Sequence, residues 1–155
     1  MVETGAGTNA PPQVNRFQKF GLSMQVFMLR RGWMGKASDF LLVITTKGRR
    51  TGRNATIPIS YKMDGEEIIT LNPGNSNWFK NVLAAGSAIL EIKGRKFEAV
   101  GRLVTDEKER RSIFEKYRTD DPKIFERLFR IPAVSPEEEL LRVLSKWKFI
   151  KFTKR

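Results

Sequence analysis

Residues 40–61 read FLLVITTKGRRTGRNATIPISY, and this stretch decides how the chain folds. Its two ends, 40–44 and 55–61, are short, rich in β-branched and aromatic residues and bounded by turn residues, which is typical of β-strands. The joining residues 45–53 contain two glycines and four cations. Glycine lets backbone N–H groups point at an anion, and arginine supplies forked, permanently charged donors. The stretch predicts a hairpin whose turn holds a phosphate or carboxylate; a turn whose charges only keep the hairpin soluble is the alternative.

Length and charge set limits on the kind of protein. The chain has 155 residues, 40% of them hydrophobic, which suits a single globular domain with a real core. Lys and Arg outnumber Asp and Glu by 29 to 17, so the formal net charge is +12. The excess is uneven, because residues 1–53 contain nine cations against two acids. Such a field attracts a polyanion, which can be a nucleic acid, an anionic lipid surface or an acidic cofactor.

Missing residue types exclude several chemistries. The sequence contains no cysteine and no histidine. Disulfides, thiolate metal sites, cysteine nucleophiles, histidine bases and a haem held by a proximal histidine are thereby excluded, and no metal site is expected. Tyr61 and Tyr117 remain as proton donors. An enzyme built from these residues needs a bound cofactor that carries the reactivity.

The N-terminal region divides into two segments. Residues 1–12, rich in Gly, Ala, Thr and Pro, predict a flexible tail, and 13–155 a single domain. Within that domain, 14–31 has the spacing of an amphipathic helix, with Phe17, Phe20, Met24, Phe27 and Met28 on one face. We expect this helix to lie against the mouth of the barrel described below and to shape a substrate pocket; contact with an anionic membrane is a second expectation. The sequence predicts no signal peptide and no membrane-spanning run, hence a cytoplasmic protein that the helix can attach to a membrane.

The rest of the sequence predicts an α+β fold. The predicted strands cover residues 40–46, 55–63, 66–72, 87–93, 95–104 and 147–153, and the predicted helices 77–85, 105–117, 120–128 and 136–144. Ser76, Thr105 and Ser135 are the expected helix N-caps. Residues 147–153 nearly alternate apolar with polar, so we expect that strand to have one face in water. Antiparallel strands with a few peripheral helices in so short a chain predict a closed or half-closed barrel.

Two motifs resemble a known family. Residues 42–52, LVITTKGRRTG, are followed by Ile57-Pro58-Ile59, Tyr61 and the turn Asp64-Gly65, and this order resembles the deazaflavin-dependent nitroreductase family of split β-barrel, FMN-binding-like proteins. Residues 77–86, NWFKNVLAAG, are similar to that family's Trp-aromatic-x-Asn-Leu segment. The resemblance covers about residues 26–118. It implies coenzyme F420 as cofactor and reduction of a small electron-poor acceptor, such as a quinone or a nitroaromatic.

The resemblance also implies roles for individual residues. Arg49, Arg50 and Thr51 would grip the phosphate or acidic tail of the coenzyme, and Ile57 and Pro58 would offer backbone beside the deazaflavin ring. The full set of expected cofactor-binding residues, including Arg53 of the cationic turn, is Arg49, Arg50, Thr51, Arg53, Ile57, Pro58, Pro73, Gly74, Asn75, Trp78 and Asn81. The best-known members have Ser-Lys-Gly where this chain has Asn72-Pro73-Gly74, so a lysine is missing here. A hydride would pass to the acceptor, and the proton would come from water or from Tyr61.

Other functions stay open at this stage. The same fold can hold FMN in place of F420, or it can carry F420 without catalysis, and a homodimer is compatible with either. A basic barrel can also carry single-stranded nucleic acid on exposed aromatic side chains. Only Trp147, Phe149 and Phe152 among lysines suit that role, and their spacing is that of a strand facing a core, so no nucleic-acid partner is expected.

Overall fold

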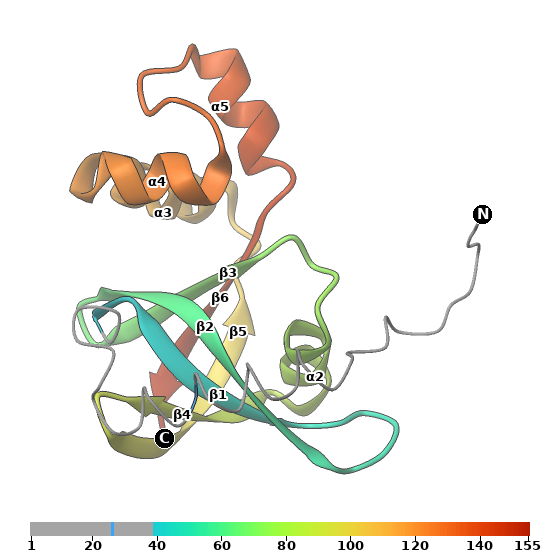
Figure 1. The fold of residues 1–155 in the computed structure, drawn as a ribbon. Helices are drawn as coiled ribbons and strands as arrows, with labels where there is room; N and C mark the ends of the chain where they lie inside the picture. The colour runs from blue at the N-terminus through green and yellow to red at the C-terminus, as the bar shows by residue number, and fades with distance from the viewer. Residues whose placement is uncertain (1–25, 27–38) are drawn as a thin grey trace.

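In the computed structural model, Val26 and residues 39–155 are described, and they form a six-stranded barrel with four helices (Figure 1). The strands are β1 (Leu41–Lys47), β2 (Asn54–Asp64), β3 (Glu67–Asn72), β4 (Ser87–Ile92), β5 (Arg95–Leu103) and β6 (Lys148–Lys154). The helices are α2 (Asn77–Ala85), α3 (Glu107–Asp120), α4 (Pro122–Phe129) and α5 (Glu137–Leu144). The predicted fold class is confirmed, and each of these elements was expected within three residues of its observed ends.

Antiparallel pairing closes the barrel in the order β1-β2-β3-β6-β5-β4, and β4 returns to β1. The β1–β2 hairpin has the register Leu41↔Ser60 to Lys47↔Asn54, so the two strands pair along the whole of β1. The long connection from β5 to β6 contains α3, α4 and α5, which gather at one end of the barrel (Figure 1). We call these three helices the helical cap.

The barrel interior is filled by the inward side chains of all six strands and by α2. Leu42, Ile44, Leu90 and Phe152 are among the fully buried members of this cluster. Helix α2 contributes Trp78, Phe79 and Val82 to the same cluster and thereby plugs the barrel near the β1–β2 turn. Strand alternation places every second side chain inside the barrel.

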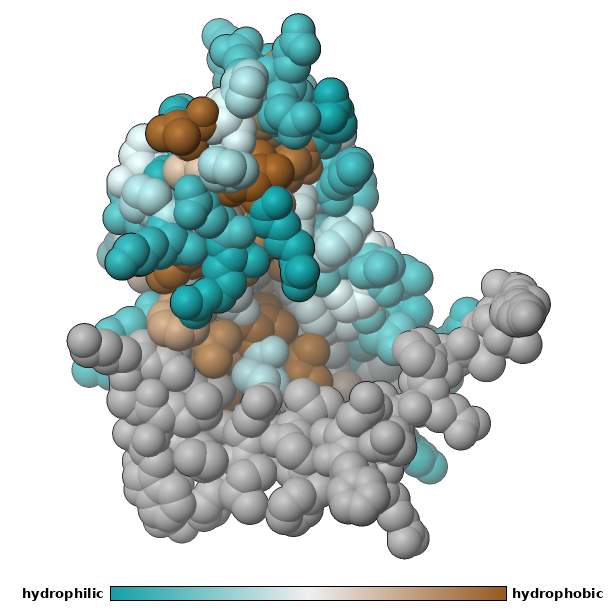
Figure 2. Space-filling view, turned by 45° about the horizontal axis from the view of Figure 1, so that its top comes forward, coloured by the Kyte–Doolittle hydropathy of each residue, from teal (hydrophilic) through white to brown (hydrophobic). Residues whose placement is uncertain are grey.

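The helical cap covers the outer face of β3 and β6 with a second apolar cluster. Phe149 of β6 and Phe114, Phe125 and Phe129 of the cap pack together, with Phe114 and Phe129 centroids 4.8 Å apart. The expectation that β6 has one wet face is therefore wrong, since residues 149–152 are all buried. Figure 2 shows apolar surface in brown where the helical cap meets the barrel.

A buried lysine occupies the outer face of β6. The Nζ of Lys151 lies 3.0 Å from Glu109, 3.1 Å from Asp64 and 3.5 Å from Glu67, and Arg102 pairs with Glu109 at 2.7 Å. Burial lowers the pKa of Lys151, but hydrogen bonds to Glu109 and Asp64 more than offset this, so the net shift is upward. The ammonium group stays charged because carboxylates surround it.

Helix ends follow capping rules with some corrections. Asp106, not Thr105, caps α3 by accepting from the Glu109 N–H, and Asp121 caps α4 in the same way. Ser76 is the N-cap residue of α2, as expected, although its side chain makes no capping hydrogen bond. The N-cap residue of α5 is Pro136, so the expected role of Ser135 is wrong. A carboxylate complements the helix dipole better than a hydroxyl does, which explains the preference at α3.

The predicted helix 14–31 and the tail 1–12 lie outside the described residues, except for Val26. Val26 is helical and 7% exposed, and it packs against Val43 on the outer face of β1. Val43 is the cross-strand partner of Pro58. In the part of the chain that the structure describes, no helix is long and apolar enough to cross a membrane.

Candidate functional site

The turn between β1 and β2 is built by its own backbone. The Gly48 N–H donates to the Arg53 carbonyl at 2.8 Å, and the Gly52 N–H donates to the Gly48 carbonyl at 3.0 Å. Gly52 has φ 71°, a left-handed conformation that favours glycine. The Thr51 hydroxyl accepts from the Arg53 N–H at 3.2 Å. These bonds give the turn a defined shape before any ligand arrives.

A buried amide fixes this turn to α2. Asn81 is 4% exposed, and its Oδ1 accepts from the Arg49 Nη1 at 2.7 Å and from the Arg49 N–H at 3.3 Å. Its Nδ2 donates to the Thr46 hydroxyl at 3.1 Å, and Arg49 also reaches the Asn77 carbonyl at 3.3 Å. Asn81 therefore supports the site by holding Arg49, and its amide is already hydrogen-bonded.

The turn and the start of α2 enclose a cavity of about 660 Å³, which we call the cationic cavity. Its lining is Gly48, Arg49, Arg50, Thr51, Arg53, Asn54, Ala55, Asn75, Ser76, Asn77, Lys80 and Asn81. Four of these side chains are cationic and none is a carboxylate. Arg50 and Arg53 are exposed and make no ion pair with the described residues. The cavity thus offers free guanidinium groups, as an acidic ligand requires.

The loop before α2 forms the other wall of the cationic cavity. Asn72 Oδ1 accepts from the Gly74 N–H at 2.7 Å, while Asn72 Nδ2 donates to the Ser76 hydroxyl. Gly74 has φ 102°, and an added Cβ would lie 2.9 Å from the side chain of Lys148. Lys148 enters from β6, opposite Asn72. A lysine stem therefore lies beside Gly74, although position 73 is proline in this sequence.

The remaining expected residues lie in the 73–75 loop, on β2 and on α2. Pro73 and Asn75 are exposed, and Asn75 lines the cationic cavity. Pro58 lies on the outer face of β2, half-buried, whereas Ile57 packs against the barrel interior. Trp78 is 6% exposed and belongs to the interior cluster. The structure thus brings the turn, the 73–75 loop and α2 together.

Tyr61 does not line the cationic cavity. It lies seven residues beyond Asn54 on β2, in the interior cluster, and it lines a second cavity beside the helical cap. Burial raises the pKa of Tyr61. Two smaller influences oppose each other, since the charge of Lys93 lowers this pKa and the charge of Asp39 raises it. A phenol in this setting keeps its proton at neutral pH.

Sequence reasoning missed several lining residues and the positions of others. Lys80, Asn54 and Ala55 line the cationic cavity but stood outside the expected set. The only sequence signal for Lys80 was its position directly after Trp78-Phe79 at the start of a predicted helix.

The nucleic-acid alternative lacks an exposed aromatic surface. Phe149 and Phe152 are fully buried, and the rings of Trp147 and Phe129 pack with their centroids 5.1 Å apart.

Sequence comparison identifies the family. Residues 23–129 match the F420H(2)-dependent quinone reductase family. The chain belongs to this family. No curated protein matches the chain significantly in sequence. As a member of the F420H(2)-dependent quinone reductase family, the protein is an oxidoreductase that uses coenzyme F420 and reduces a small-molecule acceptor.

Solved structures agree on the fold. A protein named as a pyridoxamine 5′-phosphate oxidase from Listeria innocua matches with TM-score 0.54 and 11% identity, over 85% of this chain and 92% of that one. The haem storage protein HutZ from Vibrio cholerae gives TM-score 0.54 and 11% identity, over 86% and 90%. A conserved hypothetical protein from Mycobacterium tuberculosis gives TM-score 0.54 and 14% identity, over 77% and 79%. At these identities the likeness shows the split-barrel fold alone.

Proposed function

We propose that the protein reduces a quinone-type acceptor with F420H2, and that the cationic cavity binds the phosphate and acidic tail of the coenzyme. The observation that carries this assignment is the cavity's lining of four cations without a carboxylate. A coenzyme with a phosphodiester and an oligoglutamate tail is a polyanion, so it fits this donor set. The match to the quinone reductase family supports the same acceptor class.

In this proposal, the chain's own residues bind and orient the coenzyme. Arg50 and Arg53 supply charge-assisted hydrogen bonds to the acidic groups, while Arg49 stays held by Asn81. Thr51, the Pro73-Gly74-Asn75 loop and Lys80 complete the walls around the phosphate. Beyond the turn, Pro58 presents the outer face of β2 to the ring, with Ile57 supporting it from inside and Trp78 supporting α2. When bound, reduced F420 supplies the hydride.

Proton supply needs no dedicated acid on the protein. Tyr61 was the candidate donor, yet its raised pKa makes it a weak acid at neutral pH. We therefore assign the proton to water, and we expect Tyr61→Phe to retain most of the rate of F420H2 oxidation.

A fluorescence titration tests the cofactor assignment. F420 and FMN are added separately to the purified protein at low and at moderate salt. We expect F420 to bind more tightly, and its affinity to fall as salt rises, because cationic contacts to a polyanion are screened. Equal or tighter binding of FMN would contradict the proposal. Oxidation of F420H2 with menadione as acceptor then separates an enzyme from a non-catalytic F420 carrier.

The N-terminal helix and the assembly state belong to the same proposal. We infer that residues 14–31 cover the outer face of β1 and contribute to the acceptor side, since Val26 packs on Val43 beside Pro58. A chain lacking 1–12 should keep its quinone reductase activity, and one lacking 1–31 should lose it.

Membrane contact and a homodimer are tested separately. Sedimentation with anionic vesicles tests membrane contact, and size-exclusion chromatography with light scattering tests a homodimer.

A further inference from the structure

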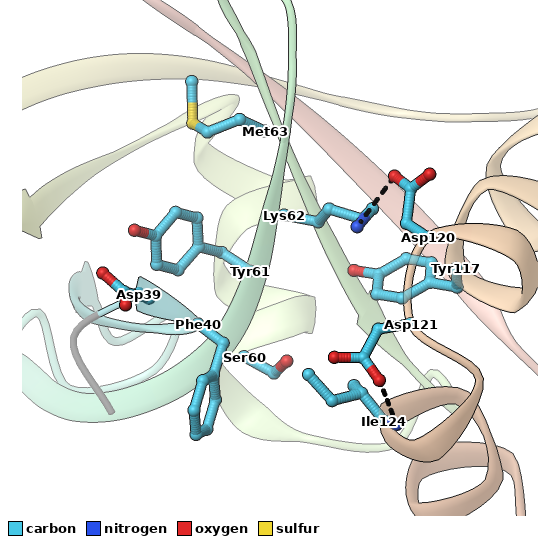
Figure 3. A pocket seen from close by; sticks show the side chains of 10 residues that line it. All are labelled: Asp39, Phe40, Ser60, Tyr61, Lys62, Met63, Tyr117, Asp120, Asp121 and Ile124. Carbon is cyan, nitrogen blue, oxygen red and sulfur yellow. Dashed lines mark hydrogen bonds and ion pairs between the residues drawn. The ribbon is translucent and has the colours of Figure 1, made fainter. Parts of the chain in front are cut away.

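A second cavity, of about 570 Å³, lies between the end of β2 and the helical cap (Figure 3). We call it the cap cavity. Its lining is Asp39, Phe40, Ser60, Tyr61, Lys62, Met63, Tyr117, Asp120, Asp121 and Ile124. It shares no residue with the cationic cavity.

One buried hydroxyl in this lining has no partner. Tyr117 is 4% exposed, and its hydroxyl makes no hydrogen bond with the described residues. Figure 3 shows the hydroxyl pointing from α3 toward β2, between Lys62 above and Ile124 below. An unpaired buried polar group costs about 1 to 3 kcal/mol, so native proteins rarely keep one without a use. A ligand with a hydrogen-bond acceptor would satisfy it.

The charges of the cap cavity select against anions. Three carboxylates and one ammonium line it, opposite in sign to the cationic cavity. The carboxylates are already engaged: Asp120 pairs with Lys62 at 3.1 Å, Asp39 with Lys93 at 3.1 Å, and Asp121 caps α4. Aromatic and apolar side chains form the remaining walls. The cavity therefore suits an uncharged, flat molecule that carries a carbonyl oxygen.

The two cavities lie along one strand. Asn54 and Ala55 at the start of β2 line the cationic cavity, and Ser60 to Met63 line the cap cavity. Side chains of Pro58, Ser60 and Lys62 share a face of the strand, because strand residues alternate. Ser60 follows Pro58 by about 7 Å at a rise of about 3.4 Å per residue. A ring bound at Pro58 therefore has the cap cavity as its neighbour.

We propose that the cap cavity binds the electron acceptor and that Tyr117 positions it by donating a hydrogen bond to a carbonyl oxygen of a quinone. This inference rests on the proposed function, since it takes the ring of F420 to lie at Pro58. The quinone would gain a hydride from F420H2 and a proton from water to become the hydroquinone, while F420H2, having lost that hydride and one proton to solvent, would become F420. Tyr117 keeps its own proton throughout and acts as a positioning residue.

Tyr117→Phe tests the role of the hydroxyl. Without ligand the variant should be as stable as the wild type or more stable, because it removes an unpaired buried hydroxyl. Its F420 dissociation constant should not change. With menadione as acceptor, KM should rise several-fold to about tenfold, which corresponds to one neutral hydrogen bond, and kcat should change less. An unchanged KM would contradict the role of Tyr117.

Ser60→Phe tests the cavity itself. Its side chain enters the cap cavity from β2, so the phenyl group should block the acceptor while F420 still binds. Ser112→Phe is the matched control, since Ser112 is exposed on α3 and lines neither cavity. Wild-type KM in both Tyr117→Phe and Ser60→Phe would overturn the inference.

A binding measurement separates this inference from the proposed function. Menadione is titrated into coenzyme-free protein and the thermal midpoint is followed; the chain has no cysteine to form a quinone thioether. We expect menadione to raise the thermal midpoint of the wild type and of Ser112→Phe, and to leave that of Ser60→Phe unchanged. Failure of F420 to bind would overturn the proposed function, whereas an equal rise in Ser60→Phe would overturn the acceptor site.

Discussion

The Arg49 guanidinium donates to the Asn81 amide oxygen across 2.7 Å, and this bond joins the β1–β2 turn to α2. The two residues are 32 positions apart in sequence. The Asn81 side chain also accepts from the Arg49 N–H and donates to the Thr46 hydroxyl, so one buried amide makes three hydrogen bonds to two residues. The cationic turn is consequently held in place by a helix that also plugs the barrel. Under the proposed function, this contact links coenzyme binding to barrel stability.

Asn81→Leu should weaken both properties. The substitution keeps the volume but leaves the Thr46 hydroxyl and the Arg49 donors without their buried partner, at a cost of about 1 to 3 kcal/mol in unfolding free energy. F420 affinity should fall as well, because Arg49 is released. Urea unfolding and F420 titration measure the two effects. Asn77→Ala is the stability control, since only the backbone carbonyl of Asn77 contacts Arg49. An equal loss of unfolding free energy in Asn77→Ala would argue against the link between the Arg49–Asn81 contact and stability.

The double variant Arg50→Ala/Arg53→Ala should lose affinity without losing stability. Neither side chain is in an ion pair with the described residues, and exposed charges contribute little to folding. Each charge-assisted contact to phosphate is worth about 1.5 to 3 kcal/mol, so the dissociation constant for F420 should rise at least tenfold. The salt dependence of binding should also flatten.

Arg111→Ala/Arg127→Ala removes the same charge from exposed positions on α3 and α4 that line neither cavity. We expect a small effect on F420 binding from this control. If both double variants weaken binding equally, the net charge of +12 attracts the coenzyme and the turn has no specific role.

Glu109 should make the fold sensitive to acid. Hydrogen bonds from Arg102 and then Lys151 lower the pKa of Glu109 to about 2, against 4.5 for the free group. Its stabilising contribution is therefore complete above about pH 4.5 and is lost as the pH falls toward 2. Glu109→Gln should be less stable than the wild type at neutral pH by about 1 to 3 kcal/mol and should lose stability less steeply in this window.

Thermal unfolding from pH 7 to pH 2.5 measures both slopes. Glu66→Gln is the matched control, because Glu66 is exposed and in no ion pair with the described residues. Parallel pH profiles for Glu109→Gln and the wild type would show that the Lys151 network does not cause the acid sensitivity.

The barrel could be predicted from sequence because its information is local. Short runs of β-branched and aromatic residues mark the strands, the turns at Asp64-Gly65 and Lys93-Gly94 separate neighbouring ones, and the observed pairings follow these turns. The cationic turn was visible for the same reason, since its glycines and arginines are contiguous. Residues 73–75 were placed beside it only through the family resemblance.

Contacts between distant segments could not be predicted in this way. Lys151 has the sequence pattern of a solvent-facing strand residue, and only the arrival of α3 and the β2–β3 hairpin buries it among carboxylates. Asn81 gave no signal that it would hold Arg49. The unpaired hydroxyl of Tyr117 depends on what the neighbouring elements fail to provide, and no sequence pattern encodes such an absence.

Gly74→Ala should distort the loop that forms one wall of the cationic cavity. Gly74 has φ 102°, which L residues rarely adopt, and the new Cβ would lie 2.9 Å from Cδ and Cε of Lys148. Backbone strain of this kind costs about 1 to 3 kcal/mol, and relief by moving the loop would displace Asn75 from the cavity. We expect a lower thermal midpoint and weaker F420 binding.

Two further variants separate strain from crowding. Gly65→Ala has φ 63° and no atom within 4 Å of the added Cβ, so it should lose stability without changing F420 affinity. Lys148→Ala removes the side chain that would crowd the new Cβ at position 74. The double variant Gly74→Ala/Lys148→Ala should therefore recover part of the stability that Gly74→Ala loses. If Lys148 itself contacts the phosphate in place of the lysine missing at position 73, Lys148→Ala alone will weaken F420 binding, and the double variant will recover stability but not affinity. Recovery of both would assign Lys148 a packing role only.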